Sequence, residues 1–254
     1  MKIASWNVNS LRVRLPQVLD WLEQNPVDVL ALQETKTQDA DFPVEAIQQA
    51  GYSVVYSGQK TYNGVAIQAK KEISDPVTDI NNLDDPRRRI LAATVDGVRI
   101  INLYVVNGSE VGSEKFTYKL AWLEIVTEFI KVELKHHARI VILGDFNIAP
   151  DDRDVHDPEL WKGKVLCSDE ERDAFNKILK LGFSDTFRQF DQQEKCFSWW
   201  DYRGGGFRRN HGLRIDLILA SDALSKDCIS SLIDREPRTW ERPSDHAPVI
   251  AEFG

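Results

Sequence analysis

The sequence has few cysteines and no long apolar run. Its three cysteines, Cys167, Cys196 and Cys228, are far apart and form no CxxC pair. An odd number of widely spaced cysteines indicates neither a disulfide framework nor a thiolate zinc site, so we expect three reduced thiols. No stretch approaches the roughly 18 consecutive apolar residues of a membrane span.

Positive charge is also in the minority. The chain has 32 Lys and Arg against 40 Asp and Glu, which gives a net charge of −8. This balance argues mildly against wholesale non-specific binding to nucleic acid, although a local basic face can exist on an acidic protein. Met1 is followed directly by Lys2-Ile3-Ala4, without the segments of a signal peptide. We therefore expect a soluble, cytoplasmic protein.

Apolar residues, by contrast, make up 42% of the 254 residues, which is enough for one large domain with a sizeable core. Hairpins and strand-helix-strand units are both predicted, so we expect an α/β sandwich with mixed sheets and not a barrel of eight regular repeats. The apolar patterns predict strands at 2–7, 27–32, 52–57, 65–69, 90–95, 98–104, 140–143, 197–200, 214–220, 228–233 and 249–253, and helices at 11–22, 43–49, 116–134 and from 168 to a stop at Gly182.

Residues 140–147, IVILGDFN, form the most informative stretch. Four apolar residues predict a strand buried on both faces, and Gly144 lets the backbone bend where polar groups begin. In an extended chain Asp145 and Asn147 would point the same way, toward one site. On this tetrapeptide alone, a simple turn that closes the strand is an equally good interpretation.

Three further apolar runs also adjoin polar groups that could converge at one edge of packed sheets. Glu34, Asp145 and Asp245 are hard oxygen ligands suited to Mg²⁺ or Mn²⁺, whereas the sequence offers no plausible His and Cys cluster for zinc. His246 offers an imidazole, which Asp216 could orient by accepting its ring proton. Isolated surface residues remain the alternative for each. The four strand ends are Trp6-Asn7-Val8-Asn9, Gln33-Glu34, Asp145-Phe146-Asn147 and Ser244-Asp245-His246.

These groups match the needs of phosphodiester hydrolysis, which are a positioned water, neutralisation of the phosphoryl charge and stabilisation of the leaving alkoxide. Five motifs, in this order along the chain, resemble the exonuclease III family of abasic-site endonucleases, in the endonuclease/exonuclease/phosphatase superfamily. They are WNVNSLR from residue 6, LQET from 32, GDFN from 144, GLRID from 212 and SDHAP from 244.

The resemblance implies a single catalytic domain, residues 1–254, with a four-layer α/β sandwich of two facing mixed β-sheets flanked by helices. It also implies Mg²⁺-dependent cleavage of double-stranded DNA 5′ to an abasic site, with 3′-5′ exonuclease and 3′-diesterase activity on blocked 3′ ends. We expect a monomer. Relatives of this fold that cleave phospholipid or inositol phosphates, and a binding protein without activity, are the alternatives.

The resemblance also implies roles for individual residues. The metal would be held by Glu34, with Asn9 and Asp245 close by. Asp145, helped by Asn147, would orient or deprotonate the attacking water. The groups implied to contact the scissile phosphate are His246 (held by Asp216), Asn7, Tyr104 and Asn107. Val106 stands where the family frequently has proline, which puts the rigidity of that loop in doubt.

Two regions are predicted to contact the DNA beyond the scissile phosphate. Residues 203–211, RGGGFRRNH, predict a mobile loop in which Arg208 and Arg209 meet phosphates and Phe207 wedges between base steps; a solvated basic loop is the alternative. Trp161 and Leu166, in the polar segment 151–167, are expected to tune which DNA is cut. The residues that match the family's apolar pocket for an extruded abasic sugar are Trp199, Trp200, Leu213 and Ile215, and Arg214 is also expected to bind the substrate. Neighbouring residues in a strand face opposite ways, so we expect one of the two tryptophans to be core.

Overall fold

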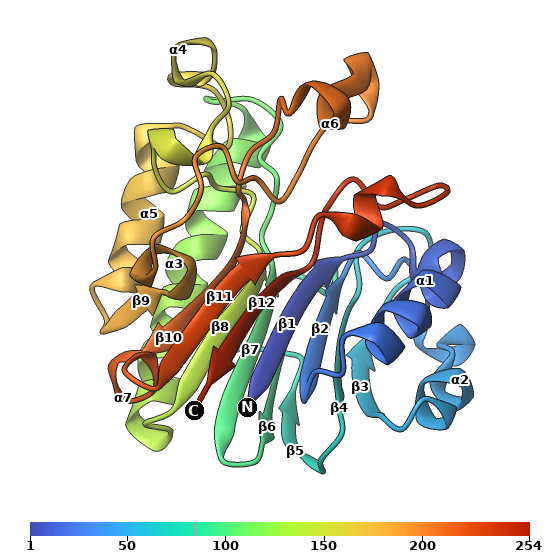
Figure 1. The fold of residues 1–254 in the computed structure, drawn as a ribbon. Helices are drawn as coiled ribbons and strands as arrows, with labels where there is room; N and C mark the ends of the chain where they lie inside the picture. Colours follow the sequence, from blue (N-terminus) through green and yellow to red (C-terminus); the bar gives the residue numbers. More distant parts are fainter. Residues whose placement is uncertain (84) are drawn as a thin grey trace.

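The fold consists of two six-stranded β-sheets packed face to face and flanked by helices (Figure 1). The computed structural model describes residues 1–83 and 85–254. The first sheet has the order β11-β12-β1-β2-β4-β3 and the second β5-β6-β7-β8-β10-β9. The strands of the first sheet are β1 (Lys2–Asn7), β2 (Val29–Gln33), β3 (Ser53–Ser57), β4 (Val65–Ala69), β11 (Cys228–Ile233) and β12 (Val249–Phe253). Those of the second sheet are β5 (Ile73–Val77), β6 (Ile90–Val95), β7 (Val98–Tyr104), β8 (Ile140–Asp145), β9 (Phe183–Asp185) and β10 (Asp216–Ser221).

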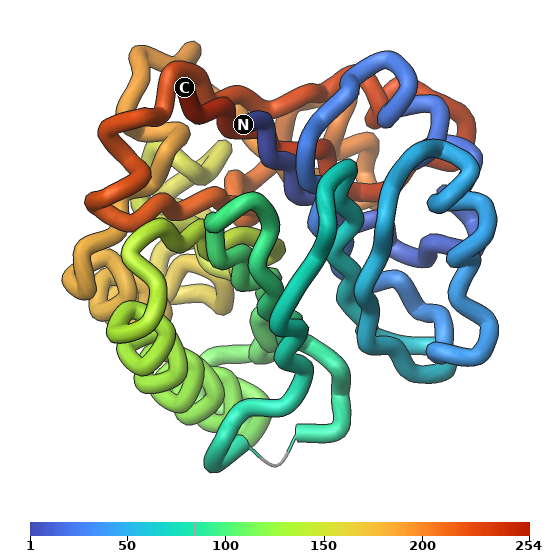
Figure 2. The backbone as a smooth tube through the Cα atoms, turned by 90° about the horizontal axis from the view of Figure 1, so that it is seen from below, coloured from blue at the N-terminus to red at the C-terminus, as the bar shows by residue number. Residues whose placement is uncertain are grey.

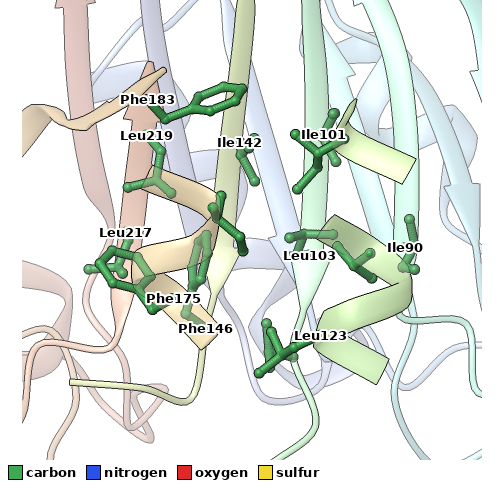
Figure 3. Close-up of a cluster of buried hydrophobic side chains, with 14 of the residues drawn as sticks. Ile90, Ile101, Leu103, Leu123, Ile142, Phe146, Phe175, Phe183, Leu217 and Leu219 are labelled. Carbon is green, nitrogen blue, oxygen red and sulfur yellow. The ribbon is translucent and has the colours of Figure 1, made fainter. Parts of the chain in front are cut away.

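Three apolar clusters separate the four layers. Side chains such as Ile3, Ile100 and Val141 fill the space between the sheets. The outer face of the first sheet packs against α1 (Leu11–Gln24) and α2 (Val44–Gln49). The outer face of the second packs against α3 (Glu114–His136) and α5 (Asp169–Leu179), where Phe146 and Phe175 meet edge to face (Figure 3). Figure 2 shows α3 on the side of the molecule opposite α1 and α2.

Each sheet contains one parallel pair of neighbouring strands, and this pairing determines where the polar strand ends meet. β1 runs parallel to β2, with Asn7 opposite Gln33, and β7 runs parallel to β8, with Tyr104 opposite Asp145. The antiparallel β10 begins beside the end of β8, with Asp216 opposite Asp145. The carboxyl ends of parallel strands and the beginnings of their antiparallel neighbours share one edge, so the predicted convergence is confirmed.

Short helical segments rise above this edge. They are α4 (Pro158–Trp161) and α6 (Gly206–Arg209), which stand at the end of the molecule away from the two termini (Figure 1). At the opposite end the termini lie together, where Phe253 N donates to Met1 O at 2.8 Å. No helix within residues 1–83 and 85–254 is long and apolar enough to cross a membrane.

The predicted four-layer α/β sandwich is confirmed, and most predicted elements lie within two residues of their observed bounds. The predicted strand at 197–200 is wrong, because Trp199 makes only isolated bridges to Leu213 and His246. Two strands were not predicted. β5 contains Pro76 and has three exposed residues in succession, so it lacks an alternating pattern, and β9 has only three residues.

The glycine-rich stretch 203–211 is also more regular than predicted. It forms a 3-10 turn (Arg203–Gly205) followed by the one-turn helix α6. Gly204 and Gly205 adopt φ of 65° and 66°, which glycine permits without strain. Gly206 is buried, and a Cβ there would lie 2.7 Å from the Asp201 carbonyl oxygen. The three glycines therefore specify a compact turn, and the expectation that this stretch holds no regular element is wrong.

Candidate active site

The amide of Asn7 lies between two carboxylates at the shared edge of the sheets. Its Nδ2 donates to Glu34 Oε1 at 3.0 Å and to Asp145 Oδ2 at 2.9 Å. Asn7 ends β1, Glu34 follows β2 and Asp145 ends β8, so this one side chain connects the two sheets. A neutral donor therefore holds two acidic groups close together.

Tyr104, the last residue of β7, contacts the same carboxylate. Its hydroxyl donates to Glu34 Oε1 at 2.9 Å. Burial, together with the charges of Glu34 and Asp145, raises the pKa of Tyr104 well above its ordinary value. Arg89, which sequence reasoning did not assign, lies over the ring at 4.5 Å from the centroid. Tyr104 is therefore a protonated donor at neutral pH, and its contact with a substrate phosphate stays a prediction.

His246 is clamped between two aspartates. Its Nδ1 lies 2.9 Å from Asp216 Oδ2, and its Nε2 lies 3.8 Å from Asp145 Oδ2. Burial alone would lower the pKa of His246, but the charges of Asp216 and Asp145 raise it to about 10. The ring is therefore an imidazolium at neutral pH that donates Nδ1–H to Asp216, and the predicted pairing of these two residues is confirmed.

Asp145 has the environment of a group that exchanges protons near neutral pH. Burial raises its pKa to about 7; His246 opposes this shift, and the charges of Asp216 and Glu34 add to it. A carboxylate whose pKa lies near the working pH is well suited to accept a proton from water.

The expectation that Asp145 and Asn147 point the same way from an extended chain is wrong in detail. β8 ends at Asp145, and Asn147 has a φ of 48°. The chain turns, so that Asn147 N donates to Asp145 Oδ1 at 2.9 Å. The Asn147 side chain instead donates to Val105 O and accepts from Asn107 Nδ2, each at 3.0 Å. The side chains of Asn107 and Asn147 thus form a pair of amides beside Asp145, and Asn107 is exposed.

Two carboxylates are arranged so that they could hold a metal ion. Atoms of Glu34, Asp145 and His246 lie within 4.8 Å of one another, but both nitrogens of the protonated His246 ring carry a hydrogen, so Glu34 and Asp145 are the candidate ligands. Asp245 and Asn9, which were predicted as ligands, lie beside this group: Asn9 Nδ2 donates to Asp245 Oδ1 at 2.9 Å. Asn7 therefore links Glu34 to Asp145, whereas Asn9 contacts Asp245.

Lys36, which sequence reasoning did not consider, supplies a cation at this position. Its Nζ lies 2.9 Å from Glu34 Oε2 and also donates to Asn9 Oδ1. Burial disfavours the charged form of Glu34, but Lys36 and Asn7 hold its pKa below the ordinary value. Oxygen atoms that already bind an ammonium ion fit a hard divalent cation. The signal in the sequence was a lysine two residues after the predicted ligand.

The backbone around these oxygens departs from regular geometry. Asn9, Glu34 and Lys36 have φ of 43°, 51° and 51°, and Ser10 has a φ of 91°. Residues other than glycine adopt such positive values at a cost of order 1–3 kcal/mol each, and they cluster at functional sites. The convergence of four at one place marks these loops as shaped for a ligand.

The sequence and the structure both match known proteins. Residues 4–246 match the Endonuclease/Exonuclease/phosphatase family. The chain belongs to this family. Exodeoxyribonuclease III of Haemophilus influenzae is 36% identical over 267 residues, with full coverage of both chains. The expected family and enzyme class are confirmed: the protein is a phosphodiesterase of the exodeoxyribonuclease III and AP endonuclease type.

Solved structures of the family agree with this fold. A Neisseria enzyme described as the 3′ phosphatase NExo bound to product DNA hairpin is 50% identical, covers 100% of this chain and 99% of its own, and has a TM-score of 0.98. A structure of NExo from Neisseria meningitidis titled as a 3′-5′ exonuclease is 51% identical, with the same coverage and TM-score. An AP endonuclease from Archaeoglobus fulgidus is 38% identical, with coverage of 100% and 99% and a TM-score of 0.96.

Two residues predicted to bind the substrate, Trp200 and Arg214, are part of the protein interior instead. Trp200 is fully buried and packs edge to face on Phe207. Arg214 is 1% exposed, and its guanidinium binds the carboxylates of Asp154 and Asp185. Neither side chain is presented to a substrate, which argues against a substrate contact by either. The burial of Trp200 agrees with the expectation that one of the two adjacent tryptophans is core. Sequence alone cannot distinguish a motif arginine that binds the substrate from one that is neutralised by carboxylates inside the protein.

Trp199, Leu213 and Ile215 do form an apolar cluster, but it is filled. Leu213 and Ile215 are 0% and 1% exposed, so they do not line an open pocket as predicted. Trp199 is half-buried and donates Nε1–H to Asp245 Oδ2 at 3.0 Å. The side chain of Leu166 completes the cluster and is 4% exposed.

Leu166 occupies this place at a conformational cost. Its φ of 74° is in the left-handed region, which costs an ordinary residue roughly 1–2 kcal/mol and a glycine almost nothing. Its backbone is fixed on both sides, because Leu166 N donates to Glu171 at 3.0 Å and its carbonyl accepts from Ala149 N at 2.7 Å. Leu166 is therefore held firmly in the apolar cluster beside Trp199, Leu213 and Ile215, and its effect on which DNA is cut stays a prediction.

The residues of α6 divide into inner and outer groups. Phe207 is half-buried, with the guanidinium groups of Arg235 and Arg238 5.3 and 5.0 Å from its ring centroid. It is therefore a packed residue, which argues against the predicted wedge. Arg208 and Arg209 are exposed and form no ion pair within the described part of the chain. Their contact with DNA phosphates stays a prediction.

Proposed function

We propose that this protein is a Mg²⁺-dependent DNA repair nuclease that acts on the 3′ ends of duplex DNA, as a 3′-5′ exonuclease and 3′ phosphatase. The convergence of Glu34, Asp145 and the His246–Asp216 pair supports phosphodiester chemistry. The relatives at 50% and 51% identity are described as a 3′ phosphatase and a 3′-5′ exonuclease.

In this proposal Asp145 takes the proton of the attacking water as the water oxygen bonds to phosphorus and the bond to the leaving oxygen breaks. His246 Nε2–H lies too far from Asp145, at 3.8 Å, for a strong hydrogen bond. It is therefore available to a phosphoryl oxygen, where its positive charge stabilises the negative charge of the transition state. Asn7 holds Asp145 in position, and Asp216 holds His246.

Mg²⁺ would be held by Glu34, with Asp145 and Asn9 nearby, where the oxygen atoms suit a hard cation. When bound, the ion supplies positive charge to the phosphoryl oxygens and lowers the pKa of a bound water. Mn²⁺ would be the natural substitute, because it accepts the same oxygen ligands.

Incision 5′ to an abasic site is the second candidate activity, which the 38% identity to an AP endonuclease favours. The observation that supports our choice between them is the burial of Leu166 among Trp199, Leu213 and Ile215. An enzyme that accepts an extruded sugar needs an open pocket for it. With this space filled, we propose that 3′-end processing exceeds incision at internal abasic sites.

Leu166→Gly tests this choice. Removal of the side chain opens the cluster, and glycine accepts the observed φ without strain, so we expect incision at a tetrahydrofuran abasic analogue to rise about tenfold or more relative to 3′-end processing. The measurement is single-turnover rates on two labelled duplexes. Leu166→Ala should open the pocket as well, but with a lower melting temperature, because alanine keeps the strained φ.

Leu179→Ala is the matched control. Leu179 is the last residue of α5, and it packs against the core between the second sheet and its helices, outside the Leu166 cluster. It should lower the melting temperature without changing the ratio of the two rates. An unchanged ratio in both Leu166 variants would show that this side chain does not select the substrate.

Binding of DNA by an acidic protein should depend on a few exposed arginines. We expect Arg208→Ala with Arg209→Ala to weaken binding to all duplex sequences and to flatten the salt dependence by about 0.9 log units per log salt for each lost phosphate contact. The measurement is a salt titration of duplex affinity. Lys131→Ala with Lys177→Ala removes the same charge from the exposed face of α3 and α5 and should leave the slope unchanged. Equal slopes for the arginine double variant and the parent would exclude a phosphate contact by α6.

A further inference from the structure

Lys119 and Glu171 form an ion pair that is completely enclosed by the protein. Both side chains are 0% exposed. The Lys119 ammonium also donates to the carbonyl oxygens of Asn147 at 2.7 Å and Asn107 at 3.1 Å. An ammonium has three donors, and all three are thus in use. A Cβ at Gly108 would lie 3.1 Å from Lys119 Cδ, so the lysine stem has little room to move.

Glu171 connects this pair to the neighbouring segment. It closes the capping box at the start of α5, where its Oε2 accepts from Ser168 N at 3.1 Å and from Ser168 Oγ at 2.7 Å. Its Oε1 accepts from Leu166 N at 3.0 Å as well as from Lys119. One buried pair therefore links the loops after β7 and β8 to the segment that carries Leu166.

The position of the pair is what requires an explanation. A buried ion pair contributes little net stability, because the loss of hydration offsets the attraction, and apolar residues of similar volume often stabilise as well. The two carbonyl groups that Lys119 holds belong to Asn107 and Asn147, whose side chains hydrogen-bond each other at 3.0 Å beside Asp145. The pair thus fixes the backbone from which both amides project.

We infer that Lys119 and Glu171 are positioning residues that hold Asn107 and Asn147 in the geometry needed for phosphodiester hydrolysis. This inference rests on the proposed function. Neither residue touches the reacting atoms; they act through the two asparagine carbonyls. A shift of about 1 Å in a positioned group can cost a rate factor of about 10².

The test uses the double variant Lys119→Met with Glu171→Met, because either single change would leave an uncompensated buried charge. We expect the double variant to fold with a melting temperature close to that of the parent. Its kcat on a duplex with a recessed 3′ end should fall about 100-fold, whereas KM for the DNA should change by less than about threefold.

A second variant and a control keep the result interpretable. Lys119→Gln with Glu171→Gln preserves one amide donor for the carbonyls, so its kcat should fall less, by about tenfold. The matched control is Arg99→Met with Glu133→Met, which removes a second buried ion pair at the far ends of β7 and α3. Its kcat should stay within about twofold of the parent. Parental kcat in both Lys119 and Glu171 double variants would overturn the inference.

Combination with Asn147→Ala separates positioning from general destabilisation. If the pair acts through Asn147, adding Asn147→Ala to Lys119→Met and Glu171→Met should lower kcat by much less than the product of the separate effects. Independent, multiplicative losses would overturn the inference while leaving the proposed function intact. Parental kcat for Asn147→Ala alone would instead contradict the proposed role of Asn147.

Discussion

Asp145→Asn should lower kcat on duplex DNA by about 10²- to 10⁴-fold, the range that general-base catalysis contributes, with little change in KM. The asparagine keeps the shape of the side chain but cannot accept the proton of the attacking water. The measurement is single-turnover cleavage of a labelled duplex in saturating Mg²⁺. A loss confined to KM would show that Asp145 contributes to binding and not to the chemical step.

The melting temperature of the same variant provides an independent check. Burial beside Asp216 and Glu34 raises the pKa of Asp145 to about 7. A folded-state pKa above the unfolded value means that ionisation of this group opposes folding as the pH rises above the unfolded pKa. At pH 8 the neutral asparagine removes that cost, so Asp145→Asn should not lower the melting temperature. Asp191→Asn, an exposed carboxylate, is the control and should change neither property.

Glu34→Gln should have the second large effect, on the requirement for a metal. The amide oxygen can still accept from Asn7 and Tyr104, but the charge that would attract a cation is gone. We expect the Mg²⁺ concentration for half-maximal activity to rise at least about tenfold, and excess chelator to abolish the activity of the parent. Parental activity in chelator would contradict the metal requirement.

A readout without turnover complements this titration. A ligand that binds only the folded state raises the melting temperature according to its affinity. Mg²⁺ should therefore stabilise the parent, but stabilise Glu34→Gln much less at the same concentration. Glu23→Gln, which changes an exposed carboxylate on α1, should respond to Mg²⁺ as the parent does.

The sequence predicted best what depends on local pattern. The strand before Asp145 is a continuous apolar run, and β6 and β7 flank a dipeptide typical of a hairpin turn. Apolar pattern and turn residues were therefore enough to predict both. The sequence also placed polar groups at several strand ends that could share one edge, and the resemblance implied that Asn7, Glu34 and Asp145 act at one site. The His246–Asp216 pair was predicted because a carboxylate can orient an imidazole by accepting its ring proton.

What the sequence did not reveal depends on partners remote along the chain. Arg214 is a basic residue within the GLRID motif, yet it is neutralised by Asp154, 60 residues away, and by Asp185, 29 residues away. The glycines before Phe207 suggested a mobile loop, but α6 is fixed by the packing of Phe207 on Trp200 and by Arg235 and Arg238. Such tertiary contacts override local propensity, and no local pattern announces them.

The cluster around Leu166 was predicted only in part, because some of its members have a local signal and others depend on remote contacts. The resemblance gave Leu213 and Ile215 as lining of a pocket, but the sequence could not show that both are buried in a cluster that also contains Leu166. A positive φ at a leucine is invisible in sequence, because leucine gives no signal for the left-handed region.

The most direct measurement compares three labelled duplexes with the purified protein, in Mg²⁺ and in excess chelator. One carries a 3′ phosphate, one a recessed 3′ hydroxyl end and one an internal tetrahydrofuran abasic analogue. We predict rapid release of phosphate and 3′ nucleotides from the first two in Mg²⁺, much slower incision of the third, and no reaction in chelator. Incision of the abasic duplex that is faster than both 3′-end reactions would contradict the proposed preference, and no cleavage of any duplex in Mg²⁺ would contradict the proposed nuclease function.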